Sequence, residues 1–108
     1  MESEFNSQSV SILEQIASID PEACNRIVIN EESLSHERSA ARELSQEILS
    51  AQKLLADVHS NAVRPNVAHA LIGAIRTNVF YLLDRSLSRW QGCLGIPENG
   101  PIFQLNDE

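Results

Sequence analysis

The sequence is poor in the residue types from which most catalytic, metal-binding and nucleotide-binding sites are built. It has two cysteines, three histidines and four glycines in 108 residues. Cys24 and Cys93 are far apart and form neither a disulfide framework nor a zinc knuckle, a usage that fits a reducing compartment. The histidines lack HExxH or ExxH spacing, and the glycines form no phosphate-binding loop. The sequence therefore predicts no catalytic residue, no metal and no cofactor, and we do not expect an enzyme.

Basic residues and long apolar runs are scarce too. Eight Lys and Arg stand against fifteen Asp and Glu, a formal charge of -7, whereas binding to a phosphate backbone needs clustered positive charge. The longest apolar run, 79–83, is far shorter than a membrane span. Residues 1–6 hold two glutamates and no Lys or Arg, unlike a secretory signal. We therefore expect a soluble cytoplasmic protein that binds neither nucleic acid directly nor a membrane.

The chain does contain enough apolar material, 43% of its residues, for one small core. We expect a single helical domain over 7–95, preceded by a disordered leader (1–6) and followed by an extended tail (96–108). The acidic residues are concentrated in the first half: residues 1–58 contain eleven acids and four bases, and residues 59–108 contain four of each. The bases of the second half can therefore face the acids of the first.

Apolar spacing predicts a short helix and then an extended segment at the start of the domain. The helix begins at a Ser7 or Ser9 cap and carries apolar residues at three- and four-residue spacing. Asp20 and Pro21 then either break the chain or restart a helix, since Asp can cap and Pro is tolerated at the first helical position. The β-branched segment 27–29 is expected to be extended.

Two long helices follow. The first is expected over 31–63, where no Gly or Pro interrupts the chain, with Asn30 as its cap. Pro65 ends this helix and begins the second, which we expect to run to about Cys93. Because the connection is short, the two helices must be antiparallel. The predicted fold class is all-α.

The first long helix carries apolar residues in a seven-residue frame typical of a coiled-coil seam. The frame comprises Leu34, Ala41, Ile48, Leu55 and Ala62 at one position and Leu44, Ala51 and Val58 at the other. Glu37 takes the remaining position, so this end of the seam is polar and is expected to be splayed or to face solvent. Two arrangements remain open for covering the long helices: a dimer that forms a four-helix bundle, or a monomeric three-helix bundle closed by the short helix. We favour the dimer because the first helix is short.

The segments that flank the hairpin lie at the same end of it, since its helices are antiparallel. Residues 27–29 precede the hairpin and Ile102 follows it, so they can pair as a minimal β-sheet. Ile102, Phe103 and Leu105 are expected either to dock there or to contact a partner. We favour docking, because β-branched residues lie at that end of the hairpin.

The candidate functional residues are therefore those of a protein or dimer interface on the long helices and the tail. They are Leu44, Ile48, Ala51, Leu55, Val58, Ile75, Val79, Leu82, Trp90 and Phe103. Three arginines in the second half of the chain, Arg76, Arg85 and Arg89, are expected to form ion pairs with Glu37, Glu43 or Glu47 rather than to bind phosphate.

Four stretches of the chain, 28–34, 41–44, 70–75 and 82–87, resemble a class of small bacterial helical-hairpin proteins that includes quorum-sensing anti-activators. The resemblance implies an interaction role, such as binding a transcription factor and blocking its dimerisation, and it transfers no site residue. From the residues and the resemblance together we expect a non-enzymatic regulator that sequesters a protein partner through an amphipathic helical surface. The alternative is a secretion chaperone or an immunity-type inhibitor protein.

Overall fold

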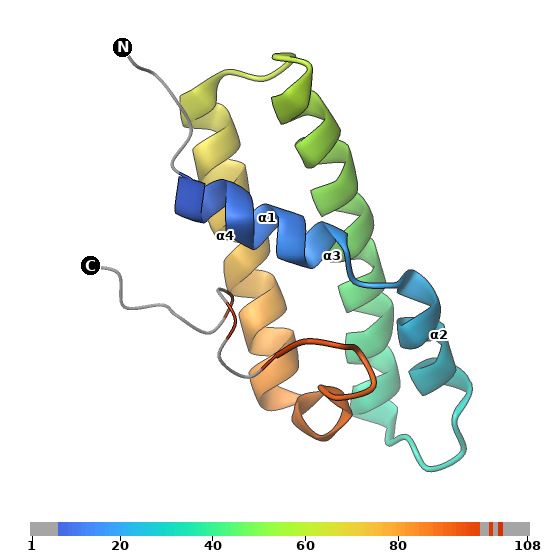
Figure 1. The fold of residues 1–108 in the computed structure, drawn as a ribbon. Coiled ribbons are helices and arrows are strands. Elements are labelled where there is room, and N and C mark those ends of the chain that lie inside the picture. Colours follow the sequence, from blue (N-terminus) through green and yellow to red (C-terminus); the bar gives the residue numbers. More distant parts are fainter. Residues whose placement is uncertain (1–6, 98–99, 101, 103–108) are drawn as a thin grey trace.

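The computed structural model describes residues 7–97, 100 and 102, and these residues form four α-helices and one 3-10 turn (Figure 1). The elements are α1 (Ser7–Ala17), α2 (Pro21–Ile29), α3 (Ser35–His59), α4 (Pro65–Arg85) and η1 (Ser88–Trp90). The described part of the chain contains no strand, so the prediction of an all-α fold is confirmed. None of its helices has the length and apolar character needed to span a membrane.

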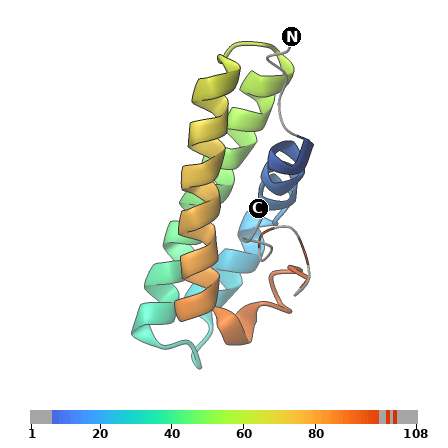
Figure 2. The same ribbon diagram turned by 90° about the vertical axis from the view of Figure 1, so that its left-hand side faces the viewer.

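The two long helices, α3 and α4, lie side by side as an antiparallel pair (Figures 1 and 2). The first ends at His59 rather than at residue 63, because Asn61 adopts a left-handed conformation (φ 59°) and the amide of Ala62 turns back to the carbonyl of Asp57. Pro65 occupies the first turn of α4, as its missing N–H and fixed φ predict. The turn between the helices is therefore set by local sequence.

The β-branched segment 27–29 is helical, so the predictions of an extended segment and of β pairing with Ile102 are wrong. Asp20 caps the helix by accepting a hydrogen bond from the amide of Glu22 (3.0 Å), and Pro21 forms its first turn. Ala23, Cys24 and Ile27 then form a buried face at helical spacing, and α2 packs on α3. Burial of this face outweighs the β propensity of three residues.

The start of α3 also differs from the prediction. Asn30 does not cap this helix: its side chain accepts a hydrogen bond from the amide of Glu32 (2.8 Å), which holds the connecting turn. The helix begins at Ser35, and the carboxylate of Glu37 accepts a hydrogen bond from the amide of Leu34 (2.8 Å). A first-turn carboxylate thus satisfies a backbone N–H that lies before the helix proper.

A single core is closed by α1, which crosses both long helices (Figure 1). Its residues Leu13 and Ile16 are fully buried, as are Leu44 and Ile48 of α3 and Val79 of α4. The apolar stripes that we expected a second copy to cover are thus covered by α1 and α2 within one chain. Helix α1 reaches both stripes because it lies across the hairpin, where a short helix suffices.

The chain leaves the helical pair earlier than predicted: α4 ends at Arg85 instead of near Cys93. The amides of Ser86 and Leu87 both turn back to the carbonyl of Leu82, after which η1 follows. Of the predicted tail the structure describes Ile96, Pro97, Gly100 and Ile102, and both isoleucines are buried.

Ile102 docks on α1 rather than beside residues 27–29. Its amide donates a hydrogen bond to Oε1 of Gln15 (3.3 Å), and its side chain is fully buried in the core. The predicted leader (1–6), Phe103 and Leu105 lie outside the described residues.

Candidate functional site

Most of the residues predicted for an interface lie inside the single chain. Six are buried in the core: Leu44, Ile48, Ala51, Val58, Ile75 and Val79. Three more are partly buried against it: Leu55, Leu82 and Trp90. Phe103 lies outside the described residues. The central part of the seven-residue frame therefore serves intramolecular packing, because α1 and α2 supply the cover that the prediction assigned to a second copy, whereas Leu34 and Ala62 at its ends are exposed.

One broad face of the helical pair remains uncovered. Helices α1 and α2 and the described residues that follow η1 all lie on the same side of α3 and α4, and the opposite side of the pair carries no other part of the described chain (Figure 2). An uncovered face of two packed helices is a natural place for a protein contact, provided that it carries apolar side chains.

Helix α4 exposes such side chains along this face. They belong to a row that alternates four- and three-residue spacing, which we name the α4 stripe: Val67, Leu71, Ala74, Asn78, Tyr81 and Arg85. All six residues are exposed, and Leu71 and Tyr81 retain 45% and 50% of their accessible surface. The row extends about 27 Å at 1.5 Å per residue. This spacing is that of a coiled-coil seam, with a polar Asn near its middle.

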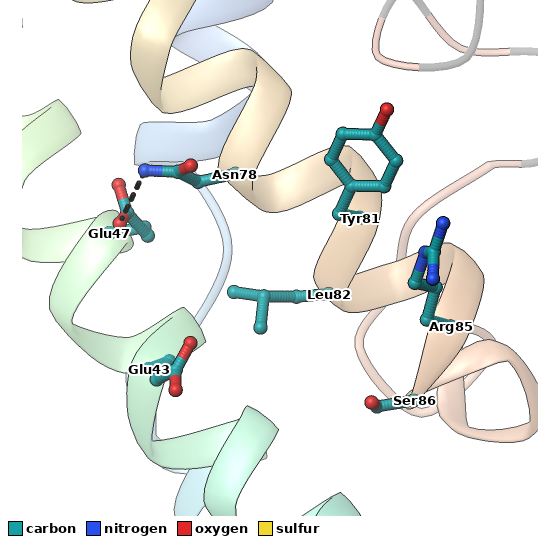
Figure 3. A pocket seen from close by; sticks show the side chains of 7 residues that line it. All are labelled: Glu43, Glu47, Asn78, Tyr81, Leu82, Arg85 and Ser86. Atoms are coloured by element: carbon teal, nitrogen blue, oxygen red, sulfur yellow. Dashed lines mark hydrogen bonds between the residues drawn. The ribbon is translucent and has the colours of Figure 1, made fainter.

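A groove between the two long helices runs beside the α4 stripe. One part of it is lined by Leu54, Leu71, Ala74 and Ile75 together with polar residues of α3. The other part is lined by Glu43, Glu47, Asn78, Tyr81, Leu82, Arg85 and Ser86 (Figure 3). The two parts share Glu47 and Asn78, which are joined by a hydrogen bond of 3.2 Å. We call this continuous feature the hairpin groove.

Charged groups at one end of the hairpin groove lack ion-pair partners. Within the described chain neither Glu43 nor Arg85 forms an ion pair. The guanidinium of Arg85 lies 5.3 Å from the ring centroid of Tyr81, and both side chains project from α4 on the same side (Figure 3). The prediction that Arg85 pairs with a glutamate therefore fails within one chain. Both charges are free to meet a partner.

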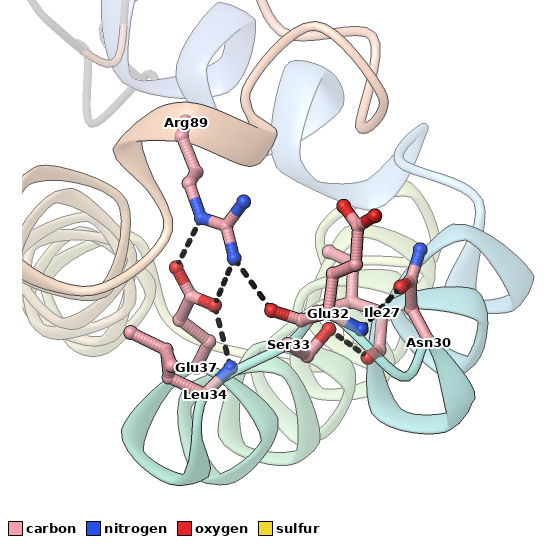
Figure 4. A network of polar contacts seen from close by, with 7 residues as sticks. All are labelled: Ile27, Asn30, Glu32, Ser33, Leu34, Glu37 and Arg89. Carbon is pink, nitrogen blue, oxygen red and sulfur yellow. Dashed lines mark hydrogen bonds and ion pairs between the residues drawn. The ribbon is translucent and has the colours of Figure 1, made fainter.

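The third arginine, Arg89, does pair as predicted, and its partner is Glu37 (Figure 4). Its Nε and Nη2 atoms donate to the two carboxylate oxygens at 2.7 and 2.9 Å, and Nη2 also donates to the carbonyl of Glu32 (2.9 Å). Glu37 is only 3% exposed, so its predicted position facing solvent is wrong. Arg89, delivered by η1 after α4, covers the carboxylate and ties the start of α3 to the end of the helical pair.

The pair sets the titration of Glu37. The hydrogen bonds from Arg89, and then that from the amide of Leu34, lower the pKa of this carboxyl from 4.5 to about 2. An ionised, fully bonded carboxylate of this kind neither gives nor takes a proton near neutral pH, which makes Glu37 a structural residue rather than a general acid or base.

We expect acid to weaken the fold through Glu37. As the pH falls, the unfolded chain binds this proton near pH 4.5 and the folded chain only near pH 2, so the stability contributed by the ionised group is complete above pH 4.5 and is lost progressively down to pH 2. The urea concentration at the midpoint of unfolding should therefore fall more steeply between about pH 5 and pH 2.5 for the native chain than for Glu37→Gln. Parallel loss in the two proteins would contradict the assignment.

The cysteines and histidines lie apart from the hairpin groove. Burial raises the pKa of the Cys24 thiol to about 11, which leaves it protonated. Cys93 is exposed. The three histidines are all exposed, and the described residues contain no group of three potential metal ligands.

The interface residues predicted on this helix were Ile75, Val79 and Leu82, and none of them belongs to the α4 stripe. Two parallel rows are present: the buried row contains Ile72 and Val79, whereas the exposed row contains Leu71 and Tyr81. The seven-residue spacing of Val67, Ala74 and Tyr81 was a usable signal, because one buried row is enough for the contacts of α4 with α3 and α1 and a second row is not needed for them.

Comparisons of the chain with protein-family models, with curated proteins and with solved structures found no match.

Proposed function

We propose that this chain is a small non-enzymatic regulator that binds and sequesters a protein partner through its uncovered helical face, formed by the α4 stripe and the hairpin groove. The observation that carries the proposal is the exposure of Leu71 and Tyr81 in one row on a helix that already packs its other row into the core. Single exposed apolar residues need no explanation, but a row at coiled-coil spacing suits a helix of another protein.

The face suits a protein better than a small molecule or a nucleic acid. The hairpin groove is long and open, bordered by a tyrosine and an arginine that resemble the anchor residues of protein interfaces. It carries three acids, Glu43, Glu47 and Asp57, against Lys53 and Arg85, so it lacks the basic cluster that phosphate recognition requires.

The partner class that we propose is a transcription regulator, with the chain acting in the cytoplasm as an anti-activator. The resemblance of 28–34 and 82–87 to helical-hairpin regulators supports this class, and the cysteine usage supports the compartment. The alternative partner, a secreted protein held by a chaperone or an immunity-type inhibitor, is distinguished by the identity of the protein bound.

We expect a tagged form of the chain to capture its partner from a lysate of the source cell, and Leu71→Glu to weaken the purified complex by about thirtyfold, as for a hot-spot residue. Leu49→Glu is the matched control, because Leu49 is similarly exposed (51%, against 45% for Leu71) but lies outside the hairpin groove and the α4 stripe. Mass spectrometry identifies the partner, and isothermal titration calorimetry measures the affinities.

The proposal further requires that the captured regulator loses its own dimerisation or its DNA binding when the chain is added. A captured secreted protein would replace the anti-activator assignment by the alternative. Equal binding by the Leu71 and Leu49 variants would remove the uncovered face from the proposal.

A further inference from the structure

We infer that in the isolated protein the uncovered face is occupied by a second copy of this chain, related by a two-fold axis parallel to the hairpin. The inference rests on the proposed function in one respect, that this face is a protein interface. The second copy occupies the uncovered face when no other protein is bound to it.

The first observation is the distribution of charge. The whole chain carries a formal charge of -7, which disfavours contact between two copies at most surfaces. The hairpin groove is close to balanced, with three acids and two bases among its lining residues. Asp57 and Lys53 already pair with each other (3.3 Å). Two copies can therefore approach each other at this face with little electrostatic cost.

The second observation is that the unpaired charges of opposite sign lie on different helices at the same end of the groove. Glu43 belongs to α3 and Arg85 to α4, and they line the same part of the groove without forming an ion pair (Figure 3). A two-fold axis parallel to the hairpin keeps both residues at their level and places α4 of each copy against α3 of the other. Arg85 of each copy then faces Glu43 of the second copy, and the pair is made twice.

The same two-fold axis also brings apolar residues of the two copies together. In this arrangement Leu71 and Ala74 of α4 lie over Ser50 and Leu54 of the second copy's α3, since these residues line one part of the groove in each chain. The four long helices form an antiparallel bundle, in which the small side chains of Ala74 and Ser50 permit close approach. The exposed part of Leu71 becomes covered.

A partner of one dominant charge fits this face less well. A strongly basic helix would meet Arg85 and Lys53, and a strongly acidic helix would meet Glu43 and Glu47. A surface that carries both signs on two antiparallel helices is complementary to its own two-fold copy.

Sedimentation of the whole chain at micromolar concentration tests the inference, with an expected mass of about 24 kDa, twice the 12.0 kDa of one chain. Arg85→Glu and Glu43→Arg should each raise the dimer dissociation constant by at least about tenfold, because each change places like charges together twice. The double variant Glu43→Arg/Arg85→Glu should restore association, since it rebuilds the pairs with reversed sign. Arg64→Glu, an exposed charge change at the turn between the helices, should leave the mass unchanged.

Circular dichroism of each variant checks that the helices are retained, so a lost dimer is not confused with unfolding. A chain that remains monomeric up to about 100 µM would overturn the inference, as would a dimer that none of the charge variants weakens. Monomers that still capture a different protein through Leu71 would leave the proposed function intact. A stable dimer in which Leu71→Glu does not affect capture would support the inference and remove the proposed function from this face.

Discussion

Replacing Ile48 by aspartate will prevent folding of the chain, whereas the same change at the adjacent Leu49 will alter its stability by no more than about 1 kcal/mol. Ile48 is fully buried at the centre of α3, and Leu49 is 51% exposed. A carboxylate at position 48 loses its hydration with no ion-pair partner, at a cost of more than about 4 kcal/mol, comparable with the whole stability of a domain of this size. Urea denaturation followed by circular dichroism measures both effects.

This pair of variants separates the two uses of the seven-residue frame on α3. If Ile48 belonged to an interface between copies, Ile48→Asp would give a folded monomer with normal helix content. The structure predicts instead that Ile48→Asp abolishes the cooperative unfolding transition, because the Ile48 side chain is part of the core that α1 and α2 complete within a single chain. A folded monomer with Ile48→Asp would contradict this assignment.

Replacing Ile102 by alanine should lower the free energy of unfolding by about 2 to 4 kcal/mol. Its side chain is fully buried, and its amide donates to Gln15 of α1, so it fixes the segment after η1 onto the first helix. Truncation leaves a cavity between elements that are far apart in the sequence, which neighbouring residues fill only in part. Thermal and urea denaturation measure the change.

Ile29→Ala is the matched control, because Ile29 is 69% exposed at the end of α2 and its truncation should change stability by about 0.5 kcal/mol or less. If the two variants lose the same stability, the docking of Ile102 on α1 is wrong. Loss of partner affinity without loss of stability in Ile102→Ala would instead assign this residue to binding, the other outcome expected from the sequence.

The sequence predicted best those features that depend on a few neighbouring residues. The starts of α2 and α4 agree with the Asp20 cap and with Pro65, since a cap or a proline acts within one helical turn. Asn30 shows the limit of this reasoning. Its side chain can cap a helix or close a turn, and only the placement of α2 on α3 decides for the turn.

Long-range packing decided the environment of individual side chains. The frame of α3 placed Glu37 at a polar end of a seam, and its true position under Arg89 depends on a residue 52 positions away in the chain. Likewise Ile27 is helical because α3 buries it, although its own neighbours favour extended structure. Patterns within one helix contain no information about such partners.

The sequence by itself determined the all-α class of the described chain and the position, just before Pro65, at which its two long helices are joined. Only the tertiary structure decided which apolar row of α4 is covered. Leu71 and Ile72 are neighbours of similar character, about 100° apart around the helix, and one is 45% exposed while the other is buried. The difference arises because α1 lies on one side of the hairpin, a choice made by contacts between segments far apart in the sequence.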